Sequence, residues 1–497
     1  MFITDNDDEL WMSRLLDNCP SLQALQVKYI CTADLEKIAL KYKHSLRVLI
    51  AAVDIDSANV LQRICQGCTA LRIFEVTCPY MNESGDAIVK ALVENCPHIE
   101  IINTGGFLLT DASMHLLATI HTIKGFTLEN NYTVTSSAMQ SFIQSHTQLD
   151  ELVLNNCSLL CIDTALVNCI AKHCGNLQKL TLIIWEEEEF DVGPIEFSYT
   201  TITDLFNGCP LLVDLTLENL DFDNSTLWTL PQYCPHLQRL RIKNLYGIEN
   251  STLSELLEGN CTLTTLDLEF TEPPVPGPAT LTATVPVPAV VPVPVDLTHI
   301  PLAGGAEEAV GEISQWNDSE YSDYYTPVLI CNNYTLTTVH IKGDGIRDSA
   351  LCDIFEYCHS LIDVHICDCT NMTDKAIYNL GRNNRNLTRL IIEGVDGLSE
   401  GCIYEIALGC SKLSILRLTY FTLSDALLQY ISTHCPSLTC LNFEKCDDIS
   451  EVGIFAIVST CMRLKVFCMT DCMVPYTPML GLLCKREVYT HVNFMME

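Results

Sequence analysis

The sequence predicts an α/β solenoid in which one short structural unit is repeated along almost the whole chain. A nine-residue pattern carries the prediction: the stretch from Cys410 to Leu418 reads Cys-Ser-Lys-Leu-Ser-Ile-Leu-Arg-Leu, and close copies begin at Cys234 and Cys435. If the first residue is position zero, apolar residues occupy positions plus three, plus six and plus eight. The even spacing of these copies and their shared apolar positions together predict the fold.

The pattern occurs sixteen times in the 497 residues, and thirteen of the fifteen spacings lie between 24 and 28 residues. The two exceptions are 35 residues, from Cys174 to Cys209, and 73 residues, from Asn260 to Asn333. Only Thr104 is polar among the 48 apolar positions. A fixed period in this range is typical of a leucine-rich-repeat solenoid. The zero positions are Cys19, Lys43, Cys68, Cys96, Ile120, His146, Cys174, Cys209, Cys234, Asn260, Asn333, Cys358, Asn384, Cys410, Cys435 and Cys461.

Each repeat is expected to form a strand and then a helix. Positions plus six and plus eight share one face of the strand and point into the core, so positions plus five, seven and nine point out of the concave face. A Ser or Thr followed by an acid marks the helix start, where the hydroxyl can cap free N–H groups and the acid meets the helix dipole. No repeat buries its apolar face alone, so parallel stacking supplies the core. The clearest helix starts are Thr373-Asp374, Ser399-Glu400, Ser424-Asp425 and Ser450-Glu451.

The same pattern divides the chain into five segments. Pro273 to Val295 is rich in Pro, Val and Ala, a composition that favours extended or disordered chain. A helix is expected near residues 7–18 and a strand near residues 488–495. The expected segments are an N-terminal capping half-repeat at 1–18, a first repeat block at 19–270, a largely disordered Pro-rich and acidic insertion at 271–327, a second repeat block at 328–470 and a C-terminal cap at 471–497.

Composition narrows the function classes. The formal net charge of −34 argues against nonspecific nucleic-acid binding, which needs a cationic surface. The acidic N-terminus lacks an apolar signal core and no run of eighteen apolar residues occurs, which predicts a cytoplasmic or nuclear protein without membrane association. The sequence contains no Gly-rich phosphate loop, Gly-x-Ser-x-Gly or His-Glu-x-x-His motif. We therefore expect no enzyme and no cofactor.

The chain has 27 cysteines, and an intracellular protein keeps them as reduced thiols. Ten occupy position zero, where a buried thiol packs as a small apolar group. The pairs Cys65/Cys68 and Cys367/Cys369 lack a second Cys or His pair at zinc-site spacing. The sequence therefore predicts no metal site.

A column of bases on the outward positions is unexpected in so acidic a chain. One explanation is an ion-pair ladder with Asp214, Glu218, Asp267 and Glu269 on neighbouring strands. The other is a site for a protein partner, acidic or phosphorylated, because Arg side chains bind carboxylate and phosphate in a forked geometry. The candidate partner-binding residues are Arg239, Arg241, Lys243, His340, Lys342, His365, Arg389 and Arg417.

Two insertions are expected to border this site. The segments 185–199 and 271–327 both begin just after a strand, and equivalent positions of a solenoid lie on the same rim. In the free protein the acidic run Glu186–Glu189 or the segment Trp316–Tyr325 could cover the bases. A partner would then displace the covering segment.

The repeat subtype resembles a known family. The core Cys-Pro-x-Leu-x-x-Leu-x-Leu, the Ser/Thr-acid step and a second Cys at plus eleven resemble the cysteine-containing leucine-rich repeats of F-box/leucine-rich-repeat proteins. The resemblance implies a protein-recognition chain that selects substrates for SCF, a cullin-type ubiquitin ligase, with the ligase adaptor as a second partner. The plus-eleven cysteines are Cys157, Cys369, Cys446 and Cys472.

The chain departs from this family at its start. Only 18 residues precede Cys19, fewer than the helical bundle of an F-box needs, so no F-box is recognisable. The alternative is an F-box-less interaction or inhibitor protein that sequesters a partner without coupling it to a ligase. The sequence leaves open whether the F-box was lost, precedes this start or was never present.

Overall fold

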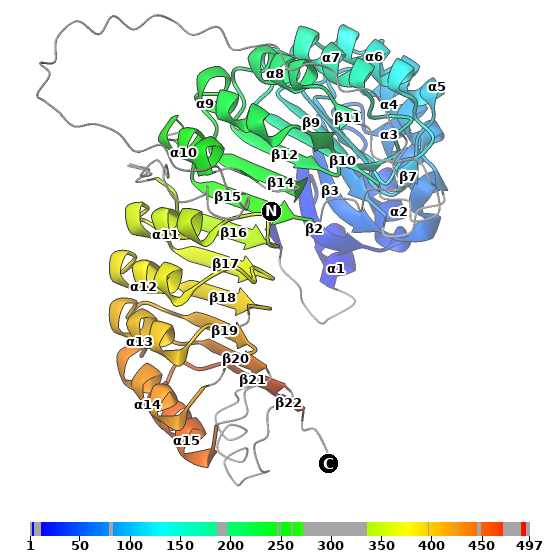
Figure 1. Cartoon of the computed structure of the whole chain (residues 1–497). Helices are drawn as coiled ribbons and strands as arrows, with labels where there is room; N and C mark the ends of the chain where they lie inside the picture. The colour runs from blue at the N-terminus through cyan, green and yellow to red at the C-terminus, as the bar shows by residue number, and fades with distance from the viewer. Residues whose placement is uncertain are drawn as a thin grey trace, which may run out of the picture. The chain divides into compact units, whose positions relative to one another are not determined.

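The computed structural model (Figure 1) describes the repeats but not the long insertion. The described repeats belong to one compact unit, formed by Met1–Glu272 and Val328–Glu497. The covering segments proposed from the sequence, Glu186–Glu189 and Trp316–Tyr325, lie outside the described residues, as do Cys446 and Cys472. The described residues are 2–3, 11–78, 83–185, 196–245, 248, 250–259, 262–271, 335–395, 397–421, 423–444, 449–470 and 489–493.

The main sheet has 18 strands and every described pairing in it is parallel. Successive repeats contribute neighbouring strands, as the period predicted. The strand expected near residues 488–495 is present as the last one, paired with the strand before it. The strands are β1 Phe2–Ile3, β2 Ala24–Ile30, β3 Val48–Val53, β4 Ile73–Thr77, β6 Ile101–Asn103, β8 Gly125–Glu129, β9 Glu151–Cys157, β10 Lys179–Ile184, β12 Asp214–Glu218, β14 Arg239–Leu245, β15 Thr265–Phe270, β16 Thr338–Lys342, β17 Asp363–Cys367, β18 Arg389–Glu393, β19 Ile415–Thr419, β20 Cys440–Glu444, β21 Val466–Thr470 and β22 Tyr489–Asn493.

Two short parallel pairs accompany the main sheet: β5 Glu83–Ser84 with β7 Phe107–Leu108, and β11 Glu196–Phe197 with β13 Asp221–Phe222. Helices α11 to α15 form a layer beside β16 to β21 in Figure 1. The helices are α1 Trp11–Asn18, α2 Thr32–Lys41, α3 Ala58–Gly67, α4 Asp86–Asn95, α5 Asp111–Leu117, α6 Ser136–Ser145, α7 Thr164–His173, α8 Tyr199–Gly208, α9 Leu230–Tyr233, α10 Asn250–Gly259, α11 Asp348–Tyr357, α12 Asp374–Asn383, α13 Glu400–Gly409, α14 Asp425–His434 and α15 Glu451–Thr460, with 3-10 turns η1 Ile55–Ser57 and η2 Asn224–Thr229.

The three apolar positions of each repeat form the core, as predicted. All 48 side chains at positions plus three, six and eight are buried, and none is more than 7% exposed. Thr104, the polar exception, is buried with the rest. The period of about 25 residues and the strand alternation therefore describe the packing correctly.

At several of the described repeats, the residue at position zero bonds to the repeat before it. The thiols of Cys96, Cys234 and Cys410 donate hydrogen bonds to main-chain carbonyls of the preceding repeat, at 3.3 Å from Cys65, 3.5 Å from Phe206 and 3.4 Å from Asn384 respectively. The last carbonyls of a helix have no partner within that helix, so a donor from the next repeat satisfies one of them. The thiols are therefore donors as well as core atoms.

Other residue types supply the same donor where the cysteine is missing. The Asn384 Nδ2 group donates to the Phe355 carbonyl at 3.3 Å, and the His146 ring contacts the Ile120 carbonyl of the preceding repeat. In the second repeat, Tyr42 caps α2 as Cys68 caps α3, and its hydroxyl donates to the Leu16 carbonyl at 2.7 Å. The assignment of Lys43 to position zero was therefore wrong by one residue. This repeat has one more residue between its helix cap and its strand.

The Ser/Thr-acid step also links repeats. The Asp348 carboxylate accepts from the main-chain N–H and the hydroxyl of Thr373, at 2.7 and 2.9 Å, and Asp374 accepts likewise from Ser399, at 2.8 and 2.5 Å. The predicted cap within the same helix is present at Ser424 and Ser450, each accepting at 3.2 Å. The side chains of Thr373 and Ser399 make no such cap bond. The expectation was wrong at Thr373 and Ser399, whose hydroxyls are hydrogen-bonded to the acid of the preceding repeat but accept no bond from their own helix.

Many of the strands have a residue with left-handed backbone at or near their end. Position plus ten has φ between 53° and 63° at six non-Gly residues, which include Asn130, Asp368 and Tyr420. Asn, Asp and Gly adopt this conformation with little strain, whereas a bulky residue such as Tyr is an outlier. In these repeats the left-handed residue turns the chain after the outward positions of the strand. The other members are Asn156, Asn219 and Asn244, with Gly106, Gly343 and Gly394.

We expect Leu416→Ala to lower the free energy of unfolding by about 2–5 kcal/mol, because it leaves a cavity between packed repeats. Leu416 is 1% exposed, whereas the side chain of its neighbour Arg417 is 44% exposed. The matched control, Arg417→Ala, should cost no more than about 1 kcal/mol, the value of an exposed ion pair. Urea unfolding followed by circular dichroism measures both. Equal losses for the two variants would contradict the inward orientation.

We also expect the nine buried position-zero thiols, which are all of them except Cys19, to resist alkylation in the folded protein. None of the 22 cysteines that the structure describes forms a disulfide, and burial raises the pKa of Cys234, Cys410 and Cys435 to about 12. Only the thiolate reacts quickly, so protonated buried thiols are protected. Iodoacetamide labelling at pH 8 with peptide mass spectrometry should modify the partly exposed Cys19 and Cys31 first. Recovery of most cysteine peptides as disulfides under non-reducing conditions would contradict the prediction that the thiols are reduced.

Candidate functional site

The outward positions of β12 to β19 form what we call the strand face, the side of the sheet away from the buried trio. All eight sequence-predicted site residues lie on it. β14 carries bases at all three outward positions, and the in-register pairing of β16 with β17 places His340 beside His365. The other members are Lys342 on β16, Arg389 on β18 and Arg417 on β19.

The bases of β14 pair with acids on both neighbouring strands. The Arg239 Nε atom lies 2.8 Å from Asp214 Oδ2, and the Arg241 Nε atom lies 2.7 Å from Asp267 Oδ2. Lys243 Nζ lies 3.2 Å from Glu218 Oε1 on one side and 3.9 Å from Glu269 Oε2 on the other. Parallel register makes these contacts possible, because Arg241 is directly opposite Asp267.

The same alternation continues along the sheet, so the ladder weighed from the sequence is present. Each of the five remaining bases also has an acid on an adjacent strand. The hydrogen bond to Glu269 raises the pKa of Lys342, which keeps this ammonium charged. The distances are 2.5 Å for Lys342–Glu269, 3.6 Å for His340–Asp363, 3.6 Å for His365–Glu393, 3.6 Å for Arg389–Asp363 and 3.1 Å for Arg417–Glu393.

These pairs leave the basic side chains accessible. The side chains of Arg239 and Arg241 are 51% and 53% exposed, whereas those of Asp214 and Asp267 are 20% and 17% exposed. An exposed ion pair contributes only about 0–1 kcal/mol, because water and salt screen it. The ladder therefore orients the bases without withdrawing them from solvent.

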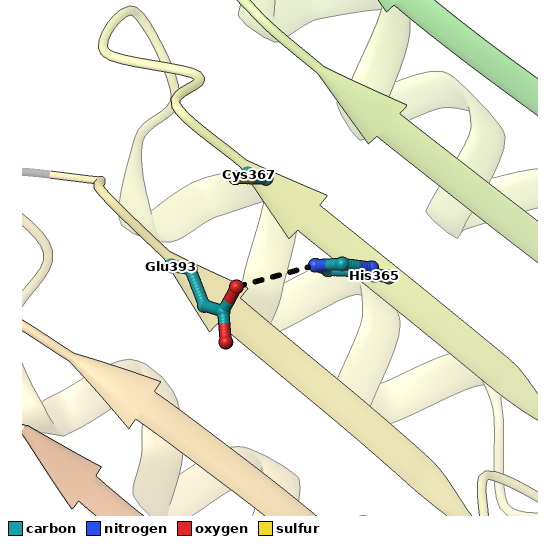
Figure 2. A group of neighbouring side chains, drawn as sticks. All are labelled: His365, Cys367 and Glu393. Carbon is teal, nitrogen blue, oxygen red and sulfur yellow. Dashed lines mark ion pairs between the residues drawn. The ribbon is translucent and has the colours of Figure 1, made fainter. Parts of the chain in front are cut away.

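The structure also brings together residues that sequence reasoning did not connect. Cys369 is 2% exposed and donates to the Gly343 carbonyl at 3.3 Å, whereas Cys367 is partly exposed on the strand face. Figure 2 shows His365 and Cys367 on β17 and Glu393 on β18, with the Glu393 carboxylate facing the imidazole. The two-residue spacing of His365 and Cys367 was a usable signal, because such residues share one face of a strand. Treating Cys367 and Cys369 as a pair hid it.

Burial lowers the pKa of His365, and the nearby Glu393 carboxylate only partly offsets this. The imidazole is therefore neutral near pH 7. Its ring lies in an edge-to-face arrangement with His340, with centroids 5.7 Å apart. The charged rungs of the ladder thus flank the pair of imidazole rings formed by His340 and His365.

The described part of the chain contains no helix long and apolar enough to cross a lipid bilayer. No known family model matches the sequence. GRR1-like protein 1 of Arabidopsis thaliana is 22% identical over 481 residues, which cover 94% of this chain and 73% of that protein.

Among solved structures, the Rad7 and Elc1 complex of yeast has a similar backbone. The TM-score is 0.44 at 14% sequence identity, and the match covers 84% of this chain and 79% of that chain. A leucine-rich-repeat protein of Leptospira interrogans has a TM-score of 0.42, 12% identity and coverage of 97% and 98%. The buried trios, the parallel strands and the alternating helices make this chain a leucine-rich-repeat protein.

Proposed function

We propose that the chain is a non-enzymatic protein-recognition module and that its strand face binds an acidic or phosphorylated segment of a protein partner. The observation that carries the proposal is β14, with Arg239, Arg241 and Lys243 on three successive outward positions and both arginines about half exposed. Each guanidinium contacts its acid through Nε. The outer edge of such a fork suits a further carboxylate or phosphate.

We further infer that this recognition serves SCF-type ubiquitin ligation, with the partner as substrate and the ligase adaptor as a second partner. The support is the cysteine-containing repeat subtype, which resembles that of F-box/leucine-rich-repeat proteins. The curated relative, GRR1-like protein 1, matches over 94% of the chain at 22% identity. This role places the protein in the cytoplasm or nucleus, where the thiols stay reduced.

The second candidate function is that of an interaction or inhibitor protein that sequesters its partner without ligase coupling. In that case the strand face holds a partner without passing it to a ligase. The two functions share the binding surface and differ in the adaptor. They are therefore separable by one experiment.

The test is affinity purification of the tagged full chain from its own cells, with quantitative mass spectrometry of the bound proteins. Wild type and the triple variant Arg239→Ala, Arg241→Ala and Lys243→Ala are compared. We expect the variant to lose a bound protein by tenfold or more while it retains an adaptor and a cullin. Binding to a synthetic phosphopeptide from that protein should also lose most of its salt dependence, since the three bases supply the local electrostatic attraction.

The matched control removes three bases from the helix side instead: Arg63→Ala, Lys90→Ala and Arg382→Ala. Their side chains are 56%, 64% and 62% exposed, and each lies within 4.0 Å of an acid, as on the strand face. This control changes the net charge equally and should leave binding intact. A partner lost with the triple variant but no adaptor would support sequestration. Equal binding by all three proteins would overturn the proposed surface.

A further inference from the structure

Three metal-ligand side chains meet on the strand face without forming a hydrogen-bonded cluster. The donor atoms of His365, Cys367 and Glu393 all lie within 4.8 Å of one another. The His365 Nε2 atom lies 3.6 Å from Glu393 Oε2, which is beyond hydrogen-bond distance, and this buried nitrogen has no hydrogen-bond partner. A buried polar atom left unsatisfied calls for an explanation such as an ion.

Charged neighbours also contact these donors. The Cys367 thiol donates to Asp368 Oδ2 at 3.2 Å, a bond that metal binding would replace. Arg417 Nη1 lies 3.1 Å from Glu393 Oε1, so one carboxylate oxygen is occupied and the other faces His365. Lys342, which is opposite Cys367 in the register, is bonded to Glu269 at 2.5 Å. The Lys342 ammonium is thus held by a carboxylate of β15. The side chains of His365 and Glu393 are only 32% and 27% exposed, which limits competition from water.

The donor types identify the ion. One imidazole nitrogen, one sulfur and one carboxylate oxygen form a mixed set that suits Zn²⁺ and disfavours Mg²⁺ or Ca²⁺, which prefer oxygen ligands. Zinc bonds of about 2.0 Å to nitrogen and about 2.3 Å to sulfur require the donors to approach slightly, by rotation of side chains. Three protein ligands leave a fourth tetrahedral position open.

We propose that His365, Cys367 and Glu393 form a three-ligand site for a divalent first-row transition metal ion, with Zn²⁺ as the best match. Binding deprotonates the Cys367 thiol, and the proton passes to the solvent. The fourth position holds water in the free protein and is open to a donor from a bound partner. The metal site itself does not depend on the proposed function, because the chain alone supplies its three ligands.

Cobalt titration of the purified, reduced full-length protein tests the site, because tetrahedral Co²⁺ with a thiolate ligand absorbs in the visible and near ultraviolet. We expect one equivalent of Co²⁺ to produce both absorptions and Zn²⁺ to abolish them. His365→Ala and Cys367→Ser should each weaken binding by about 100-fold or more, since even outer-shell changes cost about 10–100-fold. Glu393→Ala should weaken it similarly.

The control is Cys440→Ser, which removes another partly exposed thiol of the sheet that belongs to no such cluster among the described residues. It should bind Co²⁺ like wild type. Circular dichroism and thermal unfolding confirm that every variant is folded. Absorption that persists in Cys367→Ser, or no tetrahedral absorption in folded wild type, would overturn the proposal. Because no partner is present, neither result depends on the recognition function.

Discussion

The in-register parallel pairing of the strands is the constraint on which the rest of this structure depends. It places each residue beside its equivalent in the next repeat, as Arg241 lies between Thr216 and Asp267. Any side chain that recurs at one position therefore forms a row that crosses the sheet. The buried trio forms the apolar rows, and no repeat could bury them without its neighbours. The position-zero donors and the Asp–Thr/Ser contacts are further rows, located at the two ends of the helices.

The same constraint explains how a chain with a formal charge of −34 has a nearly neutral strand face. Acids and bases balance one for one at the outward positions from β9 to β19, so the excess negative charge lies elsewhere. Screening at physiological salt acts over about 8–10 Å, so a partner on this face meets the local ladder first. The acids are Glu151, Asp214, Glu218, Asp267, Glu269, Asp363 and Glu393, and the bases are Lys179, Arg239, Arg241, Lys243, Lys342, Arg389 and Arg417.

Periodicity was sufficient to predict the strands, the buried trio and the outward orientation of the bases. It failed where a contact depends on which chemical partner a neighbouring repeat supplies. Thr373 was expected to cap its own helix, but Asp348 of the preceding repeat binds its hydroxyl. Lys43 was assigned to position zero by its spacing from the apolar residues. This repeat has one additional residue before its strand, so Tyr42 caps the helix and donates to the preceding repeat instead. The cluster of His365, Cys367 and Glu393 was missed for a related reason, because Glu393 comes from the next repeat.

The register of the strands also determines which acid lies opposite which base in the ladder. Arg241→Glu places an acid opposite Asp267 and should destabilise the fold, since like charges on adjacent strands repel. The measurement is a double-mutant cycle by urea unfolding with Asp267→Lys. The account predicts that Asp267→Lys restores about 0.5–1 kcal/mol in the Arg241→Glu background, as expected for a cross-strand pair. It predicts no restoration by Asp363→Lys, which lies on β17 and not on a strand next to β14. Equal rescue by both lysines, or by neither, would contradict the in-register pairing.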